Sequence, residues 1–545
     1  MLSRLLPSLA LISGLLVLPA AAADDPPSTA PAAAVDQTAN VSEPAPGVQP
    51  SQPGLSPELA ERLAVSSGAA TAADREDRAA LIAFYAARQS APVWVAATGL
   101  TPAGEAVVGE IRRSEDWGLE ASAFRLPTLI ASAGSEPSRI ARADAEIALS
   151  LAILKYARHA RGSRADPIAL SKNLDRKLPL LDPRQVIDAA AKAESPDAFL
   201  RFLHPQHPQF EALRQKYLAL KRGQPVAVSA DPIAPETDKK SAAKPKAAAA
   251  PPNARKLLVN MEQWRWMPES LGNFHVWVNV PEFMLRVVKD GQVIHTERVV
   301  AGKRDTQTPI FSQDMEQVIF HPNWGVPESI KKADVLPSLI RGSTRIFTFY
   351  NLKIQRGGRD VDPSTVDWST ADIRQFHVYQ PPGENNVLGN VKFRFPNKHD
   401  VYMHDTSQKK LFNADVRAFS HGCMRVRDPQ RLAELILAEV QGWPAQRVAA
   451  AFAPGGARNN QVNLGRKVPV HITYFTATAG DDGKLKQFPD IYDHESKIAL
   501  GLEGKAHLIP KEKTPGQAEA IGSLAESRGP GYAKKDPMQQ VFGNN

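Results

Sequence analysis

One change of hydrophobic pattern constrains the fold of this 545-residue chain more than any other feature. Up to about residue 222, apolar residues recur at helical spacing, as in REDRAALIAFYAARQ (residues 75–89). From about Arg255 they alternate with a period of two, as in FHVWVNV (residues 274–280). The stretch between, residues 223–253, is mainly Pro, Ala and Lys. The pattern therefore predicts an α-helical half and a mainly β half that are joined by a low-complexity linker.

Capping and turn residues predict where some elements begin and end. Thr101 is suited to the N-cap of one helix, and Asp428 to the N-cap of another that Gly442 ends. Two hairpin turns are expected, at residues 290–291 and 481–483, where Asp and Gly interrupt strand patterns. The fold class expected from these elements is α+β.

The N-terminus has the composition of a secretory signal peptide. A short basic start precedes an almost wholly apolar run at residues 5–18, and small residues follow it. We expect cleavage near Ala23 and an exported, soluble mature chain, because no later apolar stretch is long enough to cross a bilayer. The expected parts of the chain are a signal peptide (1–23), a disordered Pro/Ala-rich tether (24–57), a helical scaffold domain (58–222), the linker (223–253), a mainly β domain (254–510) and a disordered tail (511–545).

Charge and cysteine count narrow the function classes. The formal net charge of +8 suits anionic partners such as a cell wall, and an exported chain without a nucleic-acid motif is not expected to bind nucleic acid. Cys423 is the only cysteine, so no intrachain disulfide stabilises the fold. A lone thiol in an oxidising compartment is either buried as a small apolar group or kept for its reactivity.

Cys423 lies in the stretch SHGCMRV, where its neighbours suggest nucleophilic chemistry. A thiol needs a base to become a nucleophile at neutral pH, and His404 and His421 are the candidates. His404 follows an alternating strand pattern, so a strand end and a returning loop can bring it to Cys423. We expect His404 to take the thiol proton while the backbone around Asp405 orients its imidazole.

The residues around this pair suggest a substrate site. Gly422 lets the chain turn sharply, and its N–H and that of Cys423 are the expected donors to an oxyanion. Tyr402 lies on the same strand face as His404 and offers a hydroxyl, and Arg425 offers a cation for a substrate carboxylate. The expected substrate-binding residues are Ser420, His421, Gly422, Tyr402, Arg425 and Asp405.

Two other interpretations of the motif remain open. His404 and Cys423 can be ordinary core residues. Alternatively, His404, His421, Cys423 and His399 are residue types that zinc accepts, although no compact pair such as CxxC or HExxH supports a metal site. We expect neither a metal nor an organic cofactor.

The combined pattern resembles the catalytic domain of the L,D-transpeptidases (the YkuD fold). Their signature is a histidine, some fifteen residues, then Ser/Thr-His-Gly-Cys, an apolar residue and Asn or Arg, which here runs from His404 to Arg425. HPNWGVPESI, PPGENNVLGNVKFRFPNKHDVYMHDT and LFNADVRAFSHGCMRV resemble the large multidomain periplasmic branch of Gram-negative bacteria. The helical half, with DWGLEASAF, is similar to the scaffold domain of that branch. Residues 333–380 match the position of the branch's capping insertion, whereas a separate peptidoglycan-binding domain is not found.

This resemblance implies a two-step acyl transfer in the periplasm. Cys423 would attack the third-residue carbonyl of a tetrapeptide stem of peptidoglycan and release D-alanine. An amine of a second stem would then take the thioester, which gives a 3→3 cross-link. Water or a protein amine as acceptor and a wall-binding protein without activity are the alternatives. Other cell-wall synthesis proteins are candidate partners, and the resemblance implies acylation by carbapenems more readily than by penicillins.

Overall fold

The computed structural model describes residues 56–64, 71–127, 137–229 and 251–510. The predicted signal peptide, nearly all of the tether, residues 230–250 of the linker and the tail lie outside these residues. In the part that is described, no helix combines the length and the apolar character that a bilayer span needs. The expected α+β class is confirmed: a helical N-terminal half precedes a mainly β half.

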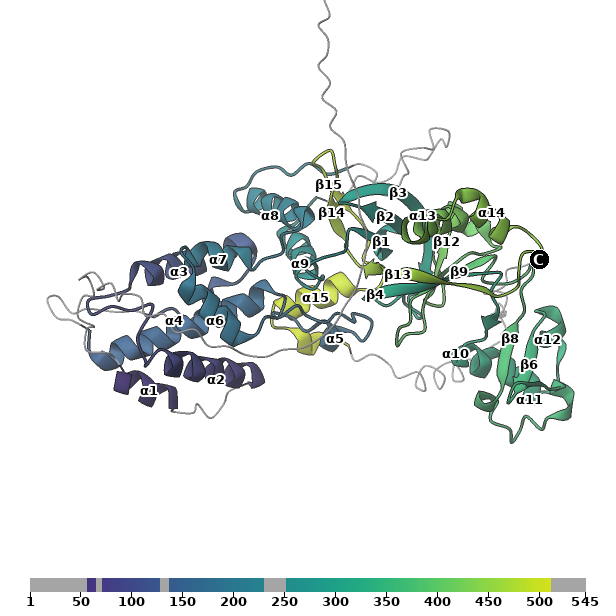
Figure 1. The fold of residues 1–545 in the computed structure, drawn as a ribbon, viewed down its shortest axis with the longest axis horizontal. Helices are drawn as coiled ribbons and strands as arrows, with labels where there is room; N and C mark the ends of the chain where they lie inside the picture. The colour runs from purple at the N-terminus through teal and green to yellow at the C-terminus, as the bar shows by residue number, and fades with distance from the viewer. Residues whose placement is uncertain (1–55, 65–70, 128–136, 230–250, 511–545) are drawn as a thin grey trace, which may run out of the picture. The chain divides into compact units, whose positions relative to one another are not determined.

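Helices of 4 to 22 residues make up the N-terminal half, and most of them have a side-chain N-cap (Figure 1). They are α1 (Ser56–Ala64), α2 (Ala72–Ala87), α3 (Pro102–Arg112), α4 (Arg139–Ala160), α5 (Pro167–Leu170), α6 (Pro183–Lys192), α7 (Pro196–Phe202) and α8 (Pro208–Lys221). Thr101 caps α3 as predicted, because its hydroxyl accepts the Gly104 N–H at 3.1 Å. The buried Glu146 of α4 accepts backbone N–H groups from Val93 and Trp94, which connects α4 to the loop before α3.

A sheet of nine strands forms the centre of the second half. The strands are β1 (Phe274–Asn279), β2 (Met284–Lys289), β3 (Gln292–Gly302), β4 (Ser312–Phe320), β9 (Val391–Arg394), β10 (Met403–His404), β11 (Ala418–Ser420), β12 (Met424–Val426) and β13 (Asn460–Thr473). Their order is β11-β3-β12-β10-β9-β4-β13-β1-β2, and β2 pairs again with β3, so that the strands close into a ring. Apolar side chains at alternate positions fill the ring, among them Val276, Met315, Phe393 and Met424.

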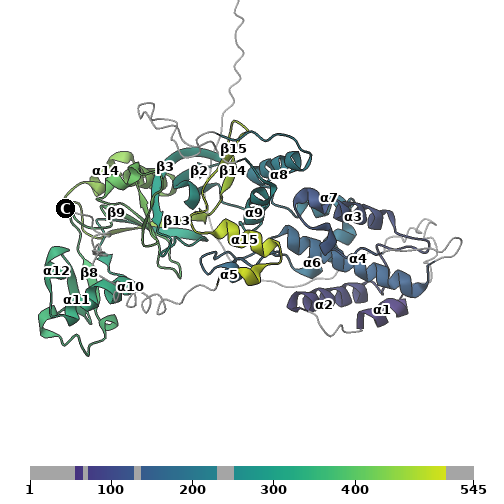
Figure 2. The same ribbon diagram turned by 180° about the vertical axis from the view of Figure 1, so that it is seen from behind.

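Helices and a hairpin cover this sheet (Figures 1 and 2). They are α9 (Ala254–Arg265), α13 (Pro429–Gln441), α14 (Ala445–Phe452), α15 (His494–Leu502) and the strands β14 (Ala477–Ala479) and β15 (Leu485–Gln487). Asp428 caps α13, and Gly442 ends it at a φ of 64°, as predicted. The expected period of two from Arg255 is wrong, because residues 254–265 form α9. Packing on two sides buries most of that helix, so it lacks the clear polar face that reveals helices in a sequence.

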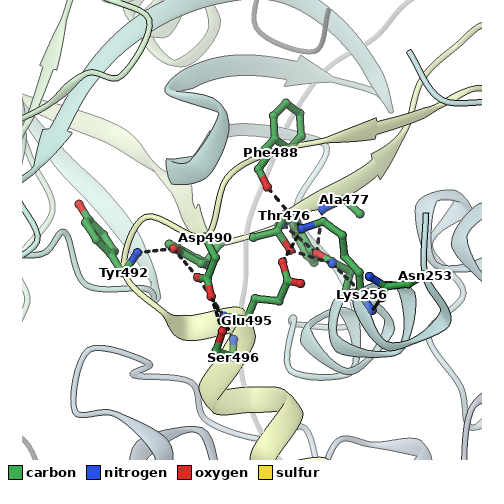
Figure 3. A network of polar contacts seen from close by, with 12 residues as sticks. Asn253, Lys256, Thr476, Ala477, Phe488, Asp490, Tyr492, Glu495 and Ser496 are labelled. Carbon is green, nitrogen blue, oxygen red and sulfur yellow. Dashed lines mark hydrogen bonds and ion pairs between the residues drawn. The ribbon is translucent and has the colours of Figure 1, made fainter. Parts of the chain in front are cut away.

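Polar contacts fix α15 beside α9 (Figure 3). The Asp490 carboxylate accepts the backbone N–H groups of Glu495 at 3.1 Å and Ser496 at 3.0 Å, at the start of α15. The Lys256 ammonium of α9 donates to Glu495 at 2.5 Å. An acidic residue at a helix N-terminus and an ion pair to the next helix both stabilise this arrangement.

The capping insertion has a small core of its own. Its elements are β5 (Trp324–Gly325), α10 (Glu328–Ile330), α11 (Leu336–Ile340), α12 (Arg345–Phe349), β6 (Lys353–Arg356), β7 (Arg359–Asp360) and β8 (His377–Gln380). The strands form a four-stranded sheet in the order β5-β8-β6-β7. Its buried cluster runs from Trp324 to Leu388 and thus extends beyond the expected bounds of 333–380 on both sides.

One segment of the helical half packs into the core of the nine-stranded sheet. Leu170 and Leu174 are buried among the apolar side chains of the nine-stranded sheet, and Leu174 forms a bridge with Ile310. The Arg176 guanidinium donates to Ser312 Oγ at 2.5 Å and also to the Ile472 carbonyl. The hydrophobic core of the β half is therefore completed by residues that precede the linker.

Candidate active site

Strand register brings the predicted catalytic pair together. β10 and β12 are parallel neighbours, with Met403 opposite Met424 and His404 opposite Arg425. Side chains alternate between the faces of a sheet. Because Met403 and Met424 point into the core, Tyr402, His404, Cys423 and Arg425 share the opposite face. The register sets Cys423 beside Tyr402 and His404 beside Arg425, so the two predicted residues, nineteen positions apart in sequence, lie diagonally across adjacent strands on one face of the sheet.

Asp405 determines the tautomer of His404. The Nδ1–H of His404 donates to the Asp405 carbonyl at 2.5 Å, which leaves Nε2 as the proton acceptor. The Asp405 carboxylate is itself fixed, because it accepts the N–H groups of Asn390 at 2.9 Å and Thr406 at 2.7 Å and the Lys409 ammonium at 2.6 Å. The expected orienting role of the backbone around Asp405 agrees with this geometry.

A tight turn presents Cys423. Gly422 has a φ of 113°, in the region that favours glycine. The Ser420 hydroxyl spans the turn, donating to the Cys423 carbonyl at 2.5 Å and accepting the Gly422 N–H at 3.1 Å. Thr308 Oγ1 donates to the Gly422 carbonyl at 2.8 Å. An oxyanion must displace Ser420 Oγ to use the Gly422 N–H, so the Cys423 N–H and the Tyr402 hydroxyl are the more accessible candidates of those predicted.

Burial keeps the catalytic pair neutral. It raises the pKa of the half-buried Cys423 thiol to about 11, although a Tyr402 N–H contact, the Lys392 ammonium and the Tyr402 hydroxyl each lower it. Burial also lowers the pKa of His404 to about 3, and the Arg425 guanidinium adds to this effect. At neutral pH the pair is therefore a thiol beside a neutral imidazole, not a thiolate–imidazolium pair.

The remaining predicted residues line the same site. Tyr402 has a pKa well above its ordinary value because of burial and the nearby thiol, to which its hydroxyl is hydrogen-bonded. Arg425 is buried and donates to Gln408 Oε1 at 2.5 Å. His421 is exposed at the edge of the site.

A groove of about 540 Å³ lies between the capping insertion and the sheet. Residues 324–330 of the insertion form one wall, and Lys392, Tyr402, His404, Cys423 and Arg425 belong to the other. Sequence reasoning missed Lys392, whose ammonium lies 3.8 Å from the centre of the Tyr402 ring. The alternation in VKFRF predicted its strand, and only the pairing with β10 places Lys392 opposite His404.

The zinc interpretation finds no support in the geometry. His399 Nε2 lies 2.9 Å from an Asp175 carboxylate oxygen, and His404 Nδ1 is occupied by the Asp405 carbonyl. Across residues 56–64, 71–127, 137–229 and 251–510, no group of three or more His, Cys, Asp or Glu side chains is arranged to hold a metal ion.

Comparisons with known proteins identify the class of enzyme. Residues 273–471 match the family model of the L,D-transpeptidase catalytic domain (YkuD), and residues 79–216 match that of the Scaffold domain. The chain therefore carries an L,D-transpeptidase catalytic domain. It has a two-domain architecture, with a helical scaffold domain ahead of the catalytic domain.

One relative and two solved structures are similar to parts of this chain. A protein of Haemophilus influenzae with the provisional name L,D-transpeptidase is 32% identical over 250 residues, which are 45% of this chain. The match spans about half (49%) of that relative. An L,D-transpeptidase structure from Mycobacterium smegmatis covers 37% of this chain and 58% of its own at 11% identity, with a TM-score of 0.17. The Ldtfm–avibactam carbamoyl enzyme covers 58% and 98% at 12% identity, with a TM-score of 0.16. Scores this low support no argument about this chain.

Proposed function

We propose that this L,D-transpeptidase forms 3→3 cross-links between peptidoglycan stem peptides through a thioester on Cys423. The observation that carries the proposal is that Cys423 and His404 line one groove, with His404 Nδ1 bonded to the Asp405 carbonyl and Nε2 left as a proton acceptor. The groove volume of about 540 Å³ lies within the range of protein sites that bind ligands. Catalysis at this site needs no metal or organic cofactor.

The first half-reaction makes the acyl-enzyme. Cys423 Sγ attacks the carbonyl of the third residue of a tetrapeptide stem while its proton passes to His404 Nε2. The Cys423 N–H and the Tyr402 hydroxyl stabilise the oxyanion. The carbon–nitrogen bond then breaks, His404 returns the proton to the leaving amine, and D-alanine departs. Arg425 holds a carboxylate of the stem.

The second half-reaction transfers the acyl group. The side-chain amine of another stem attacks the thioester, loses a proton to His404 and leaves Cys423 as a thiol again. The resemblance to periplasmic enzymes and the signal-like first 23 residues support export to the periplasm, where these stems occur. Proteins of cell-wall synthesis are the partners that such a location favours.

Muropeptide analysis tests the proposal. Purified protein is incubated with peptidoglycan, which is then digested and examined by mass spectrometry. We expect 3→3 dimers with the wild type and none with Cys423→Ala or Cys423→Ser, whose folding is checked by circular dichroism. Shortened tripeptides would mean that water is the acceptor, and peptides attached to protein would indicate envelope anchoring. Activity in either variant would exclude the thioester.

Acylation by a β-lactam tests the nucleophile directly. Attack on the strained β-lactam carbonyl passes through the same tetrahedral geometry at the site, and cleavage of the ring C–N bond then relieves the strain. A carbapenem should add one inhibitor mass to the peptide that contains Cys423. An adduct that persists in Cys423→Ala would assign the nucleophile to another residue.

A further inference from the structure

A second hollow adjoins the catalytic groove. It measures about 370 Å³ and lies against β4, β9 and β13, on the side of Lys392 away from Cys423. Lys392 lines both the groove and the hollow, so the two meet at this residue. Nothing in the proposed chemistry uses the hollow.

Register places the hollow on the catalytic face of the sheet. Gln461 of β13 is opposite Ile319 of β4, Ile319 is opposite Lys392 of β9, and Lys392 is opposite His404 of β10. The intervening Phe393 points into the core. Side chains of this one row therefore run from the far strand β13 to the catalytic histidine.

The lining of the hollow suits a peptide that carries carboxylates. Lys392 and Arg394 supply two cations, and Gln317, Asn323 and Gln461 supply amides. None of the described residues that line the hollow is acidic. Guanidinium groups bind carboxylates with paired hydrogen bonds, and side-chain amides match the donors and acceptors of a peptide backbone.

Two of these side chains are already ordered. Arg394 Nη1 donates to Gln317 Oε1 at 3.0 Å, and Gln317 Nε2 donates to Asn463 Oδ1 at 2.7 Å. This chain of contacts positions the exposed Arg394 guanidinium, whose other N–H groups can receive a ligand. At the opposite end, the Lys392 ammonium packs on Tyr402 and favours the negative charge of a Cys423 thiolate.

We propose that this hollow is a second substrate subsite, which binds a carboxylate-bearing part of a stem peptide through Arg394 and Lys392. A peptide held there reaches Cys423 by passing Lys392. The inference rests on the proposed function for the identity of the peptide, because an L,D-transpeptidase must hold two stems near one thiol.

Binding measurements test the subsite without any reaction. The full chain carrying Cys423→Ala is titrated by calorimetry with a tetrapeptide stem, either with free carboxyl groups or with the same groups converted to amides. We expect the free acid to bind about tenfold more tightly, a preference that salt weakens. Adding Arg394→Gln should reduce the preference to about twofold, and Arg394→Lys should restore part of it. The control is Arg466→Gln, which removes an exposed arginine of β13 that lies outside the hollow and should keep the tenfold preference.

The outcomes separate this subsite from the catalytic proposal. An unchanged acid preference in Arg394→Gln, or an equal loss of affinity for both peptides, overturns the subsite. Equal binding of the free-acid and amide forms of the tetrapeptide also overturns the subsite. The catalytic proposal still stands in that case if the wild type forms cross-links. A protein that prefers the acid through Arg394 but forms no acyl-enzyme would retain the subsite and contradict the thioester mechanism.

Discussion

The neutral state of Cys423 and His404 determines when the nucleophile forms. With thiol and imidazole pKa values of about 11 and 3, an ion pair at rest is disfavoured. The proton must therefore move as the substrate carbonyl arrives and the developing oxyanion compensates the charge. A thiol that stays protonated until then is also protected from oxidation, because thiolates are the reactive form.

Replacing His404 tests its role as the base. His404→Ala should lower the acylation rate at pH 7 by at least about a hundredfold. The remaining rate should rise about tenfold per pH unit up to the thiol pKa near 11, because only the thiolate then reacts. Stopped-flow acylation with a carbapenem across pH 7–10 measures both. If His404→Ala is acylated as fast as the wild type at pH 7, His421 becomes the candidate for the general base.

Individual residues differ in how far the sequence could predict them. That His404 and Cys423 line one groove could be expected, because a strand pattern precedes one and a glycine turn the other. The role of Ser420 Oγ across the turn was not, since it depends on where the hydroxyl points. Lys392 was missed because only the pairing of β9 with β10 and β4 places it beside His404.

At the scale of elements, the turn at Gly389 supports His404, the proposed base. Gly389 has a φ of 59°, and a Cβ there would lie 2.3 Å from the Asp405 carboxylate. Gly389→Ala should therefore displace Asp405, whose carbonyl orients His404. We expect a loss of at least about 1 kcal/mol in the free energy of unfolding from the backbone conformation alone, and a lower kcat. The control is Gly383→Ala, where a Cβ meets no atom within 4 Å.

Chemical denaturation and carbapenem acylation measure these two effects. A Gly389→Ala protein as stable and as active as Gly383→Ala would show that Asp405 can shift without disturbing His404.

The elements also differ in how far the sequence could predict them. α13 was predictable, because Asp428 and Gly442 mark its ends locally. The bounds of the capping insertion were not, because Trp324 and Leu388 join its core only through tertiary contacts.

At the scale of the whole molecule, buried histidines set the response to acid. Burial lowers the pKa of His159, His404, His471 and His494 to about 3. Unfolded histidines titrate near 6.5, so between pH 6.5 and about 3 the unfolded state binds more protons and stability falls as pH falls. The buried Glu146 has a raised pKa and acts in the opposite sense within the same pH range, so it offsets part of the histidine effect.

His494 offers the clearest single test. It is fully buried against the Tyr474 and Tyr492 rings, and neither ring nitrogen has a hydrogen-bond partner in the described residues. The free energy of unfolding of the wild type should fall between pH 7 and pH 5. In His494→Phe this fall should be smaller by about 2 kcal/mol. Urea denaturation at both pH values measures it, with the exposed His507→Phe as control. An unchanged pH slope would mean that His494 is protonated in the folded protein.

The scaffold half supports the active site through residues 173–176. The Asn173 amide donates to Gln307 Oε1 at 3.1 Å, and its carbonyl accepts the Ile310 N–H at 2.8 Å. Gln307 adjoins Thr306 and Thr308, whose hydroxyls donate to the Ser420 and Gly422 carbonyls at the Cys423 turn. A continuous set of contacts therefore leads from the helical half to the nucleophile.

Leu174→Ala should weaken this support. The side chain is fully buried in the core of the catalytic sheet, so its truncation should lower the free energy of unfolding by about 2–5 kcal/mol. If the segment also positions the Cys423 turn, the carbapenem acylation rate should fall at temperatures where the variant is still folded. The control is Lys177→Ala, an exposed position three residues further along the chain that should change neither quantity. A large loss of stability with an unchanged acylation rate would limit the segment to filling the core. A loss of both would make the scaffold domain part of the catalytic unit, so that the β half should not reach full activity when it is expressed without residues 163–178.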